Sequence, residues 1–316
     1  MGKELVVHIG YPKTGTTLLQ KHIFPYFKDY KYLNYEICHD LFYTVIYKDD
    51  LDYNRRVPLS KLKPFQSHEK LFASYESLTG PLWFNGLNRS SIPGRLKDLG
   101  VTKVLITIRH QVHEIDSCYR QYVQEGGILP FKVALKTEEK YSWKNIIDLD
   151  YFNYYSLIQL YADTFGKQNI LIIPSEVLKK DLAGTIRNIE AFLESPALDE
   201  AHLKRAEQKH SNKSLTNLSL KFLRLTNHFT TSKFKPNNLI TNKITTWKIR
   251  HMLQSKVDPV LPNRLSNRKN FIVDTNLESE IREYYSKSNA ALEQEFNLCL
   301  EELDYPVNDG TSYKPA

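Results

Sequence analysis

The chain has 316 residues, of which 41% are hydrophobic and 25% charged, and its formal net charge is +7. This composition excludes a disordered chain and is typical of a folded α/β protein. The N-terminal apolar run is too short for a signal peptide, and no stretch approaches the roughly 18 apolar residues of a membrane span. We therefore expect a cytoplasmic protein. Cys38, Cys118 and Cys299 lie far apart without CxxC pairing, which predicts neither a disulfide framework nor a metal site.

Strand and helix patterns alternate up to about residue 200. Apolar, β-branched runs predict strands at residues 4–10, 31–36, 70–76, 103–109 and 169–174. Helical spacing follows at residues 16–27, 110–124 and 151–165. This alternation predicts an α/β fold, a P-loop-like parallel sheet flanked by helices on both faces. Because ligands bind at the carboxyl ends of such strands, the candidate residues are Gly10 to Thr17, Glu36, Glu76 and Arg109.

The alternation stops after about residue 200, which divides the chain into two predicted parts. Residues 1–200 form the α/β core, and residues 201–316 form a helical, basic extension that packs on the core and covers the nucleotide or acceptor site. In the extension, apolar residues at spacings of three and four predict an amphipathic helix. They are Leu215, Leu218, Phe222, Leu225 and Phe229. Two interpretations stay open: the stripe docks on the sheet domain, or it lies on a membrane surface.

Positive charge is concentrated in the same extension. Residues 209–271 contain thirteen Lys or Arg and a single acid, Asp258, so the rest of the chain is net negative. Such a block indicates a local anion-facing surface rather than a generally basic protein. The alternative is a solubilising face of a mobile segment.

The stretch HIGYPKTGTT, residues 8–17, has the form of a phosphate-binding loop. Gly10 and Gly15 keep the spacing of the nucleoside-triphosphate P-loop, but Thr16 stands where that loop has its lysine, and Lys13 comes earlier. Backbone N–H groups, the hydroxyls of Thr16 and Thr17 and the charge of Lys13 would favour a phosphate. An Asp that could hold Mg²⁺ is missing from the obvious strand ends, which favours a donor that works without a metal.

Two motifs together carry a resemblance to a known family. YPKTGTT resembles the 5′-phosphosulfate loop of sulfotransferases that use 3′-phosphoadenosine 5′-phosphosulfate (PAPS), and Arg109 with Ser117 resembles their 3′-phosphate grip. The resemblance covers residues 4–195 in layout. It implies that Lys13, Thr14, Gly15, Thr16 and Thr17 bind the phosphosulfate, that the sheet has five strands and that no metal takes part. The family's Asn-Pro after the arginine is replaced here by His110 and Gln111.

The resemblance also implies roles in catalysis. Lys13 would stabilise the negative charge that develops on the leaving oxygen in the transition state. The acceptor hydroxyl needs a base, for which Glu76 is the first candidate, followed by Glu36 and then His39. Glu76 capping a helix, and His39 packed among aromatic side chains, are the alternatives that need no catalytic role.

A third, weaker element is HSNKSLT, residues 210–216. In the family a late loop often covers the nucleotide, and this would place Lys213 and Ser214 on the 3′-phosphate or adenine. Alternatively, Ser214 is the N-cap of the amphipathic helix.

The sequence as a whole is therefore interpreted as a bacterial-type, PAPS-dependent sulfotransferase that acts on a hydroxyl of a carbohydrate or glycolipid. It predicts no nucleic acid partner, suggests peripheral contact with a membrane surface and leaves the oligomeric state open. The alternatives are a P-loop kinase with a displaced lysine and a non-catalytic protein that binds anions or a membrane surface. A requirement for Mg²⁺ would identify the kinase, and turnover of PAPS would exclude the binding protein.

Overall fold

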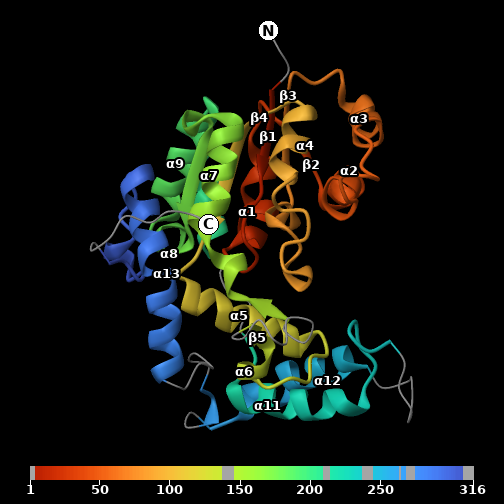
Figure 1. The fold of residues 1–316 in the computed structure, drawn as a ribbon, viewed down its shortest axis with the longest axis vertical. Coiled ribbons are helices and arrows are strands. Elements are labelled where there is room, and N and C mark those ends of the chain that lie inside the picture. The colour runs from red at the N-terminus through yellow and green to blue at the C-terminus, as the bar shows by residue number, and fades with distance from the viewer. Residues whose placement is uncertain are drawn as a thin grey trace. The chain divides into compact units, whose positions relative to one another are not determined.

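The structure is a computed structural model, and it describes residues 4–136, 146–208, 214–236, 245–262, 265–267 and 275–308. The chain divides into two compact units (Figure 1). The first unit comprises Met1–Gln111, Asp150–His210 and Arg282–Ala316, and the second comprises Val112–Leu149 and Ser211–Ile281. This division differs from the expected boundary near residue 200, because the chain leaves the first unit and returns to it twice.

Five strands form the sheet of the first unit. They are β1 Glu4–His8, β2 Lys31–Leu33, β3 Lys70–Ser74, β4 Val101–Ile108 and β7 Ile170–Pro174. They pair in parallel in the order β2-β3-β1-β4-β7. The predicted P-loop-like parallel sheet flanked by helices is confirmed.

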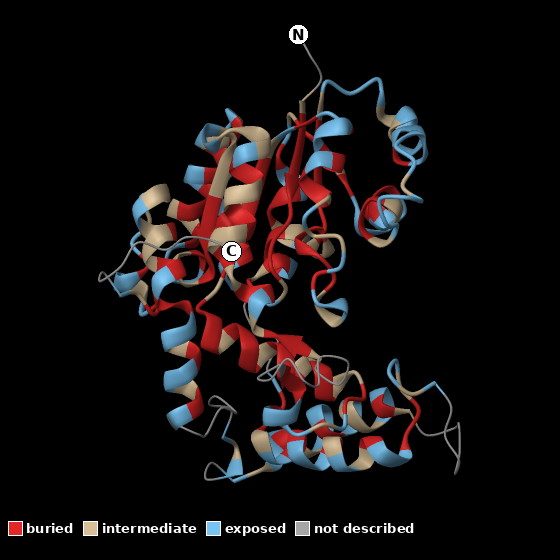
Figure 2. Cartoon of the chain, viewed as in Figure 1, coloured by how far each residue is buried: buried red, intermediate tan, exposed pale blue. Residues whose placement is uncertain are grey.

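Helices of the first unit cover this sheet on both faces. The α-helices of the first unit are α1 Thr16–His22, α2 Tyr35–Tyr47, α3 Arg56–Leu62, which packs on α2, α4 Ile92–Asp98, α7 Tyr154–Phe165, α8 Ser175–Lys180, α9 Leu182–Leu193, α10 Glu200–Glu207 and the later part of α13 Thr275–Phe296. Helices α1, α8, α9 and α10 pack with Val6, Phe72 and Leu105 in one core cluster. Helices α4 and α7 contact β4 outside that cluster. Figure 2 shows the strands buried between these layers.

The carboxyl ends of the central strands meet at one edge of the sheet. His8 of β1 is level with Ser74 of β3, and the pairing with β4 continues beyond β1 through the hydrogen bond from Tyr11 N to Thr107 O, 2.9 Å. The segments that follow β1, β3 and β4 therefore begin close together, and they contain the residues expected at the site.

The strand predicted over residues 31–36 is twice as long as the strand in the structure. Strand β2 ends at Leu33, and the side chain of Asn34 accepts a hydrogen bond from Ile37 N at 3.0 Å, which caps α2. Asparagine is among the residues that favour this N-cap geometry, so the helix begins where the strand was expected to continue. Glu36 consequently lies in the first turn of α2 and not at a strand end.

The second unit is mainly helical. Its elements are α5 Gln111–Gln124, which starts at the last residue of a first-unit segment, α6 Phe131–Ala134, the paired strands β5 Leu135–Lys136 and β6 Ile147–Asp148, α11 Asn217–Thr226, α12 Thr246–Met252 and the first part of α13.

The predicted amphipathic helix is present as α11, and part of its apolar stripe is exposed. Leu220 and Leu223 are buried, whereas Leu218, Phe222 and Leu225 are 47%, 49% and 62% exposed. Both interpretations of the stripe, docking on the sheet domain and contact with a membrane surface, stay predictions. On a helix the two sets lie on opposite sides, so α11 is apolar on both.

Candidate active site

The glycine loop, residues 10–17 between β1 and α1, has a backbone that few residues adopt. Gly10 has φ +35°, and a Cβ there would lie 2.8 Å from both Thr107 Oγ1 and Thr16 Cγ2. Gly15 has φ +95° and caps α1, and Lys13 itself is left-handed with φ 67°. Glycine is the residue that tolerates such turns, and a lysine held in this region is uncommon. The backbone conformation of the loop is therefore closely constrained.

Buried polar side chains from three strands hold the glycine loop in place. Thr14 Oγ1 donates to Tyr11 O at 2.6 Å and lies 2.6 Å from Thr107 Oγ1. Thr107 Oγ1 is 3.2 Å from His8 Nε2, and His8 Nδ1 is 2.8 Å from Ser74 Oγ. Burial lowers the pKa of His8 to about 3, so the imidazole is neutral and bonds through one donor and one acceptor nitrogen. The hydroxyl of Thr14 is thus used within the protein.

The structure brings Glu76 to the start of α1. Glu76 begins a 3₁₀ helix, Glu76–Thr79, just after β3, and its Oε1 accepts a hydrogen bond of 2.5 Å from Thr16 Oγ1. Burial raises the pKa of Glu76, while the hydrogen bond from Thr16 and the charge of Lys13 act in the opposite direction. A carboxylate with a raised pKa beside a lysine is suited to accept a proton.

Arg109 follows the last residue of β4 and reaches the same loop. Its Nη1 donates to Lys13 O at 3.3 Å, and its own carbonyl accepts a hydrogen bond of 2.7 Å from Tyr154 Oη. Arg109 Nε is buried and has no hydrogen-bond partner among the described residues. A buried N–H without an acceptor is costly in free energy, and an anion beside this guanidinium would supply the missing acceptor.

Lys179 on α8 adds a further positive charge. Two effects lower the pKa of its ammonium group, first partial desolvation and then the positive charge of Arg109. The charge of Arg109 acts on Lys179 because the two cations lie near each other. Together with Lys13, they make this edge of the sheet electropositive.

The turn after Arg109 is anchored from two later segments. His110 N donates to Glu176 Oε1 at 3.2 Å, and Glu176 Oε2 accepts a hydrogen bond of 2.8 Å from Tyr305 Oη. Both carboxylate oxygens are therefore engaged, and the backbone that carries the arginine is fixed by α8 and by the segment after α13.

A family model described as the sulfotransferase domain matches residues 3–245. The chain belongs to this family. Solved structures similar to this sulfotransferase include one from Alicyclobacillus acidocaldarius, at 17% identity and TM-score 0.47, covering 72% of this chain and 95% of that one. Another is mouse sulfotransferase SULT7A1 complexed with PAP, at 15% identity and TM-score 0.42, covering 95% and 89%. No curated protein sequence matches the chain.

Two general features concern the part of the sulfotransferase chain that the structure describes. No helix there is long and apolar enough to cross a membrane. Within the same residues, no group of three or more His, Cys, Asp or Glu side chains is placed to hold a metal. A cytoplasmic location and catalysis without a metal stay predictions.

The other candidate bases of the sulfotransferase lie on α2. Glu36 is exposed in the first turn of this helix, which corrects its expected place at a strand end. His39 is also exposed, and its ring centroid lies 6.2 Å from that of Tyr75, the residue before Glu76. His39 is thus close to the third strand's end, while no described contact joins Glu36 to the glycine loop.

Three predicted ligand-binding residues belong to the second unit's segments. Ser117 lies on α5 and is partly buried, Ser214 is exposed, and Lys213 lies outside the described residues. Ser214 is not the N-cap of α11: Thr216 is, and its Oγ1 accepts a hydrogen bond of 3.2 Å from Ser219 N. The roles of Ser117, Lys213 and Ser214 in binding remain predictions.

Sequence reasoning missed the residues that support the loop. His8 and Ser74 end two strands, and Thr107 is the last residue but one of a third, so polar residues at the buried ends of strands were the available signal. Glu176 and Lys179 gave no such signal, because a short charged helix after a strand is commonly a solvated surface.

Proposed function

We propose that this sulfotransferase moves the sulfuryl group of PAPS to a hydroxyl of a carbohydrate or glycolipid acceptor. The observation that carries the proposal is the buried Nε of Arg109, which has no partner in the part of the chain that the structure describes, beside a glycine loop that presents Lys13. An ordinary strand-to-helix turn needs neither a strained lysine nor an arginine that lacks an acceptor.

The residues of the loop fit an anionic donor. PAPS would supply the sulfuryl group, and its 5′-phosphate would be the leaving group. We assign its phosphosulfate to Lys13, to the exposed hydroxyl of Thr17 and to the backbone N–H groups of Thr14, Gly15 and Thr16. The backbone is assigned because the hydroxyls of Thr14 and Thr16 already donate within the protein.

We assign the 3′-phosphate of PAPS to Arg109, whose Nε meets no acceptor among the described residues and whose charge is reinforced by Lys179. Charge-assisted hydrogen bonds to phosphate are among the stronger polar interactions in proteins. Ser117 is added to this assignment from the spacing of the sequence motif alone.

The transfer step follows from the movement of charge. The acceptor oxygen attacks sulfur in line, its S–O bond forms, and the S–O bond to the 5′-phosphate breaks with its electron pair passing to that phosphate. Lys13 stabilises the negative charge that appears on the departing oxygen, and a group that acts on the transition state raises kcat. The products are a sulfate ester and adenosine 3′,5′-bisphosphate (PAP).

Glu76 takes the proton of the acceptor hydroxyl in this proposal. Its Oε1 is occupied by Thr16, so the proton passes to Oε2. The raised pKa of Glu76 increases its proton affinity, which favours this role over an ordinary surface carboxylate. Glu36 and His39 are the alternative bases, and His39 has the better position because it lies beside Tyr75.

A row of aromatic side chains beside Glu76 supports the choice of a carbohydrate acceptor. The ring centroid of Tyr75 is 5.6 Å from that of Tyr35, and His39 is 6.1 Å from Tyr43. Tyr35 and Tyr43 are 60% and 48% exposed. Exposed aromatic faces with polar tips suit a sugar, whose C–H groups pack on the ring while its hydroxyls reach the tips.

The donor assignment is tested by comparing two nucleotides. Calorimetry should show PAP binding about 10 to 100 times more tightly than 5′-AMP, because hydrogen bonds to a charged group are lost with the 3′-phosphate. Arg109→Gln should reduce the affinity for PAP to about that for 5′-AMP, and the exposed Arg56→Gln should leave both unchanged. Similar affinities for PAP and 5′-AMP in the unmodified protein would remove the donor from this proposal.

A further inference from the structure

The second unit exposes an apolar surface on the side of α11 that faces away from its own core. Leu218, Phe222 and Leu225, which we call the outer face of α11, are each about half exposed or more, and they recur at helical spacings of four and three. Leu220 and Leu223 pack inward on the opposite side. A helix that packs through one apolar face does not need a second apolar face for folding. An exposed second face of this kind indicates a binding surface.

Neighbouring elements of the second unit also expose apolar side chains. Phe229, just beyond α11, is 55% exposed, and Trp247 and Met252 on α12 are 67% and 44% exposed. Helix α12 contacts α11, and the segment after α11 is joined to the start of α12 by Thr230 Oγ1 and Thr246 Oγ1, 2.7 Å apart. Aromatic and long apolar side chains therefore project from two helices that are fixed to each other.

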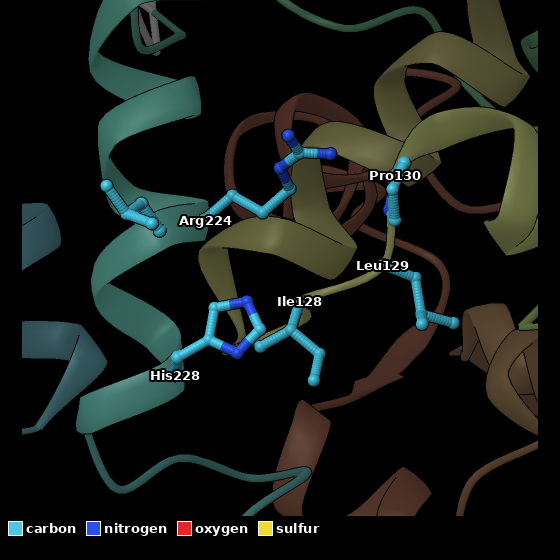
Figure 3. A pocket seen from close by; sticks show the side chains of 6 residues that line it. Ile128, Leu129, Pro130, Arg224 and His228 are labelled. Carbon is cyan, nitrogen blue, oxygen red and sulfur yellow. The ribbon is translucent and has the colours of Figure 1, made fainter.

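A cavity of about 370 Å³ lies beside the outer face of α11 and shares Leu225 with it. Its other walls are formed by Ile128, Leu129, Pro130, Arg224 and His228 (Figure 3). The cavity is thus mostly apolar and has two basic side chains among its walls. Figure 3 shows Arg224 and His228 projecting from the same helical segment toward Ile128 and Pro130.

Charge selects the kind of partner. In residues 214–236 and 245–262 there are seven Lys or Arg and one acid, Asp258. Asp258 is buried, where its Oδ1 accepts from Thr216 Oγ1 at 2.9 Å and from Ser219 Oγ at 2.5 Å. These two described segments therefore expose cations such as Lys221 and Lys248 without an exposed carboxylate. The complementary partner is anionic.

We propose that the outer face of α11, with Phe229, Trp247 and Met252, docks on the surface of a bilayer that contains anionic phospholipid. An interfacial helix buries large apolar side chains at the headgroup boundary while its Lys and Arg side chains contact anionic headgroups. Nucleic acid would be attracted by the same cations, but it gives no apolar phase for Leu218 and Leu225. This docking does not depend on the transfer chemistry. The further idea that the acceptor is a lipid-linked glycan rests on the proposed function.

The test is co-sedimentation of the full chain with vesicles of phosphatidylcholine alone and of phosphatidylcholine with phosphatidylglycerol. We expect binding to the mixed vesicles, at least about tenfold weaker binding to the neutral ones, and weakening as salt screens surface charge beyond about 8 to 10 Å. Leu218→Asp with Phe222→Asp should reduce binding to the mixed vesicles by at least about tenfold, because each loses an inserted apolar side chain. Lys221→Glu with Lys248→Glu should do so through charge alone.

The matched control is Leu51→Asp with Val57→Asp, which alters two exposed apolar residues of the first unit, 95% and 40% exposed. It should bind mixed vesicles like the unmodified chain. Thermal unfolding of the same variants reports whether they fold, and PAP calorimetry reports whether they bind the donor. Failure of the proposed function would therefore appear as a loss of PAP binding in the unmodified chain and would not change the sedimentation result.

Equal sedimentation with neutral and mixed vesicles, or none with either, would overturn the proposal. So would unchanged vesicle binding by the Leu218 and Phe222 double variant. If light scattering instead shows a dimer that this variant abolishes, without vesicle binding by the unmodified chain, the occupant is a second copy of the chain and the membrane proposal is wrong.

Discussion

The glycine loop of the first unit and the outer face of α11 in the second unit are built in opposite ways. In the loop, polar groups such as Thr14, Thr107 and His8 are buried and satisfy one another. On α11, apolar groups such as Leu218 and Phe222 are left in water. The protein alone fixes the geometry of the loop, whereas the outer face gains its stabilising contacts from outside the molecule. Substitutions should therefore affect chemistry in the first region and attachment in the second.

The largest effect is expected from Lys13→Ala. Removing a group that acts on the transition state should lower kcat by about two to three orders of magnitude, with a smaller change in PAPS affinity. The exposed Lys21→Ala on α1 is the matched control and should retain activity. Steady-state transfer from labelled PAPS and calorimetry with PAP separate the two quantities. Equal losses in kcat and in donor affinity would make Lys13 an anchor for the donor only.

Glu76→Gln should come next, with a loss of about 10²-fold in kcat, since a positioned general base typically contributes at least that much. In the unmodified enzyme, kcat should rise with pH as Glu76 loses its proton, with a midpoint above the ordinary glutamate pKa because burial raises it. The variant should lose this rise. A pH profile that is identical in both proteins would move the role of base to His39 or Glu36.

The same shift of pKa has a consequence for stability. The folded state holds the Glu76 proton more tightly than the unfolded state does, so this group favours folding at low pH. That contribution disappears as the pH rises through the folded-state pKa. Glu76→Gln should therefore not lower the free energy of unfolding at neutral pH, which separates a catalytic loss from a folding defect.

The smallest effect concerns the support of the loop. Thr107→Val would leave His8 Nε2 and Thr14 Oγ1 without their shared partner, at a cost of about 1 to 3 kcal/mol in the free energy of unfolding. Thr44→Val on α2 is the control, because Thr44 Oγ1 has no hydrogen-bond partner among the described residues, and it should not lower the free energy of unfolding by more than about 0.5 kcal/mol. Denaturant unfolding measures both. A Thr107→Val protein as stable as the control would mean that the buried chain does not hold the loop.

Much of the first unit was accessible from the sequence, because parallel strands between two helical layers are apolar throughout and end at glycine or polar residues. All five predicted strands exist, and the loop, Glu76 and Arg109 do meet at one edge. The predicted strand β2 was too long because the tyrosine in residues 34–36 (NYE) continued the aromatic pattern of the strand. In the structure the side chain of Asn34 instead caps the helix that follows.

The second unit was less accessible for a different reason. An apolar period of 3.6 identifies a helix but not which of its sides is covered. In α11 the side that faces inward carries Leu220 and Ser219, and Ser219 donates a hydrogen bond to the buried Asp258. These two residues are 39 positions apart, so no local sequence pattern shows the contact. Long-range contacts of this kind also explain why Glu176 and Tyr305 gave no signal in the sequence.

The way the first unit is assembled from separate stretches of chain has a consequence for its biogenesis. Gln111 Nε2 donates to Asn289 Oδ1 at 2.7 Å across 178 residues of sequence, and Tyr305 reaches Glu176 across 129. A ribosome makes β4 and its arginine long before it makes α13. This edge of the sheet therefore stays incomplete while the second unit is synthesised. We expect the site at this edge to fold late, because contacts that close long loops form slowly. We expect the sulfotransferase to bind its donor only after the segment that carries Tyr305 has been translated.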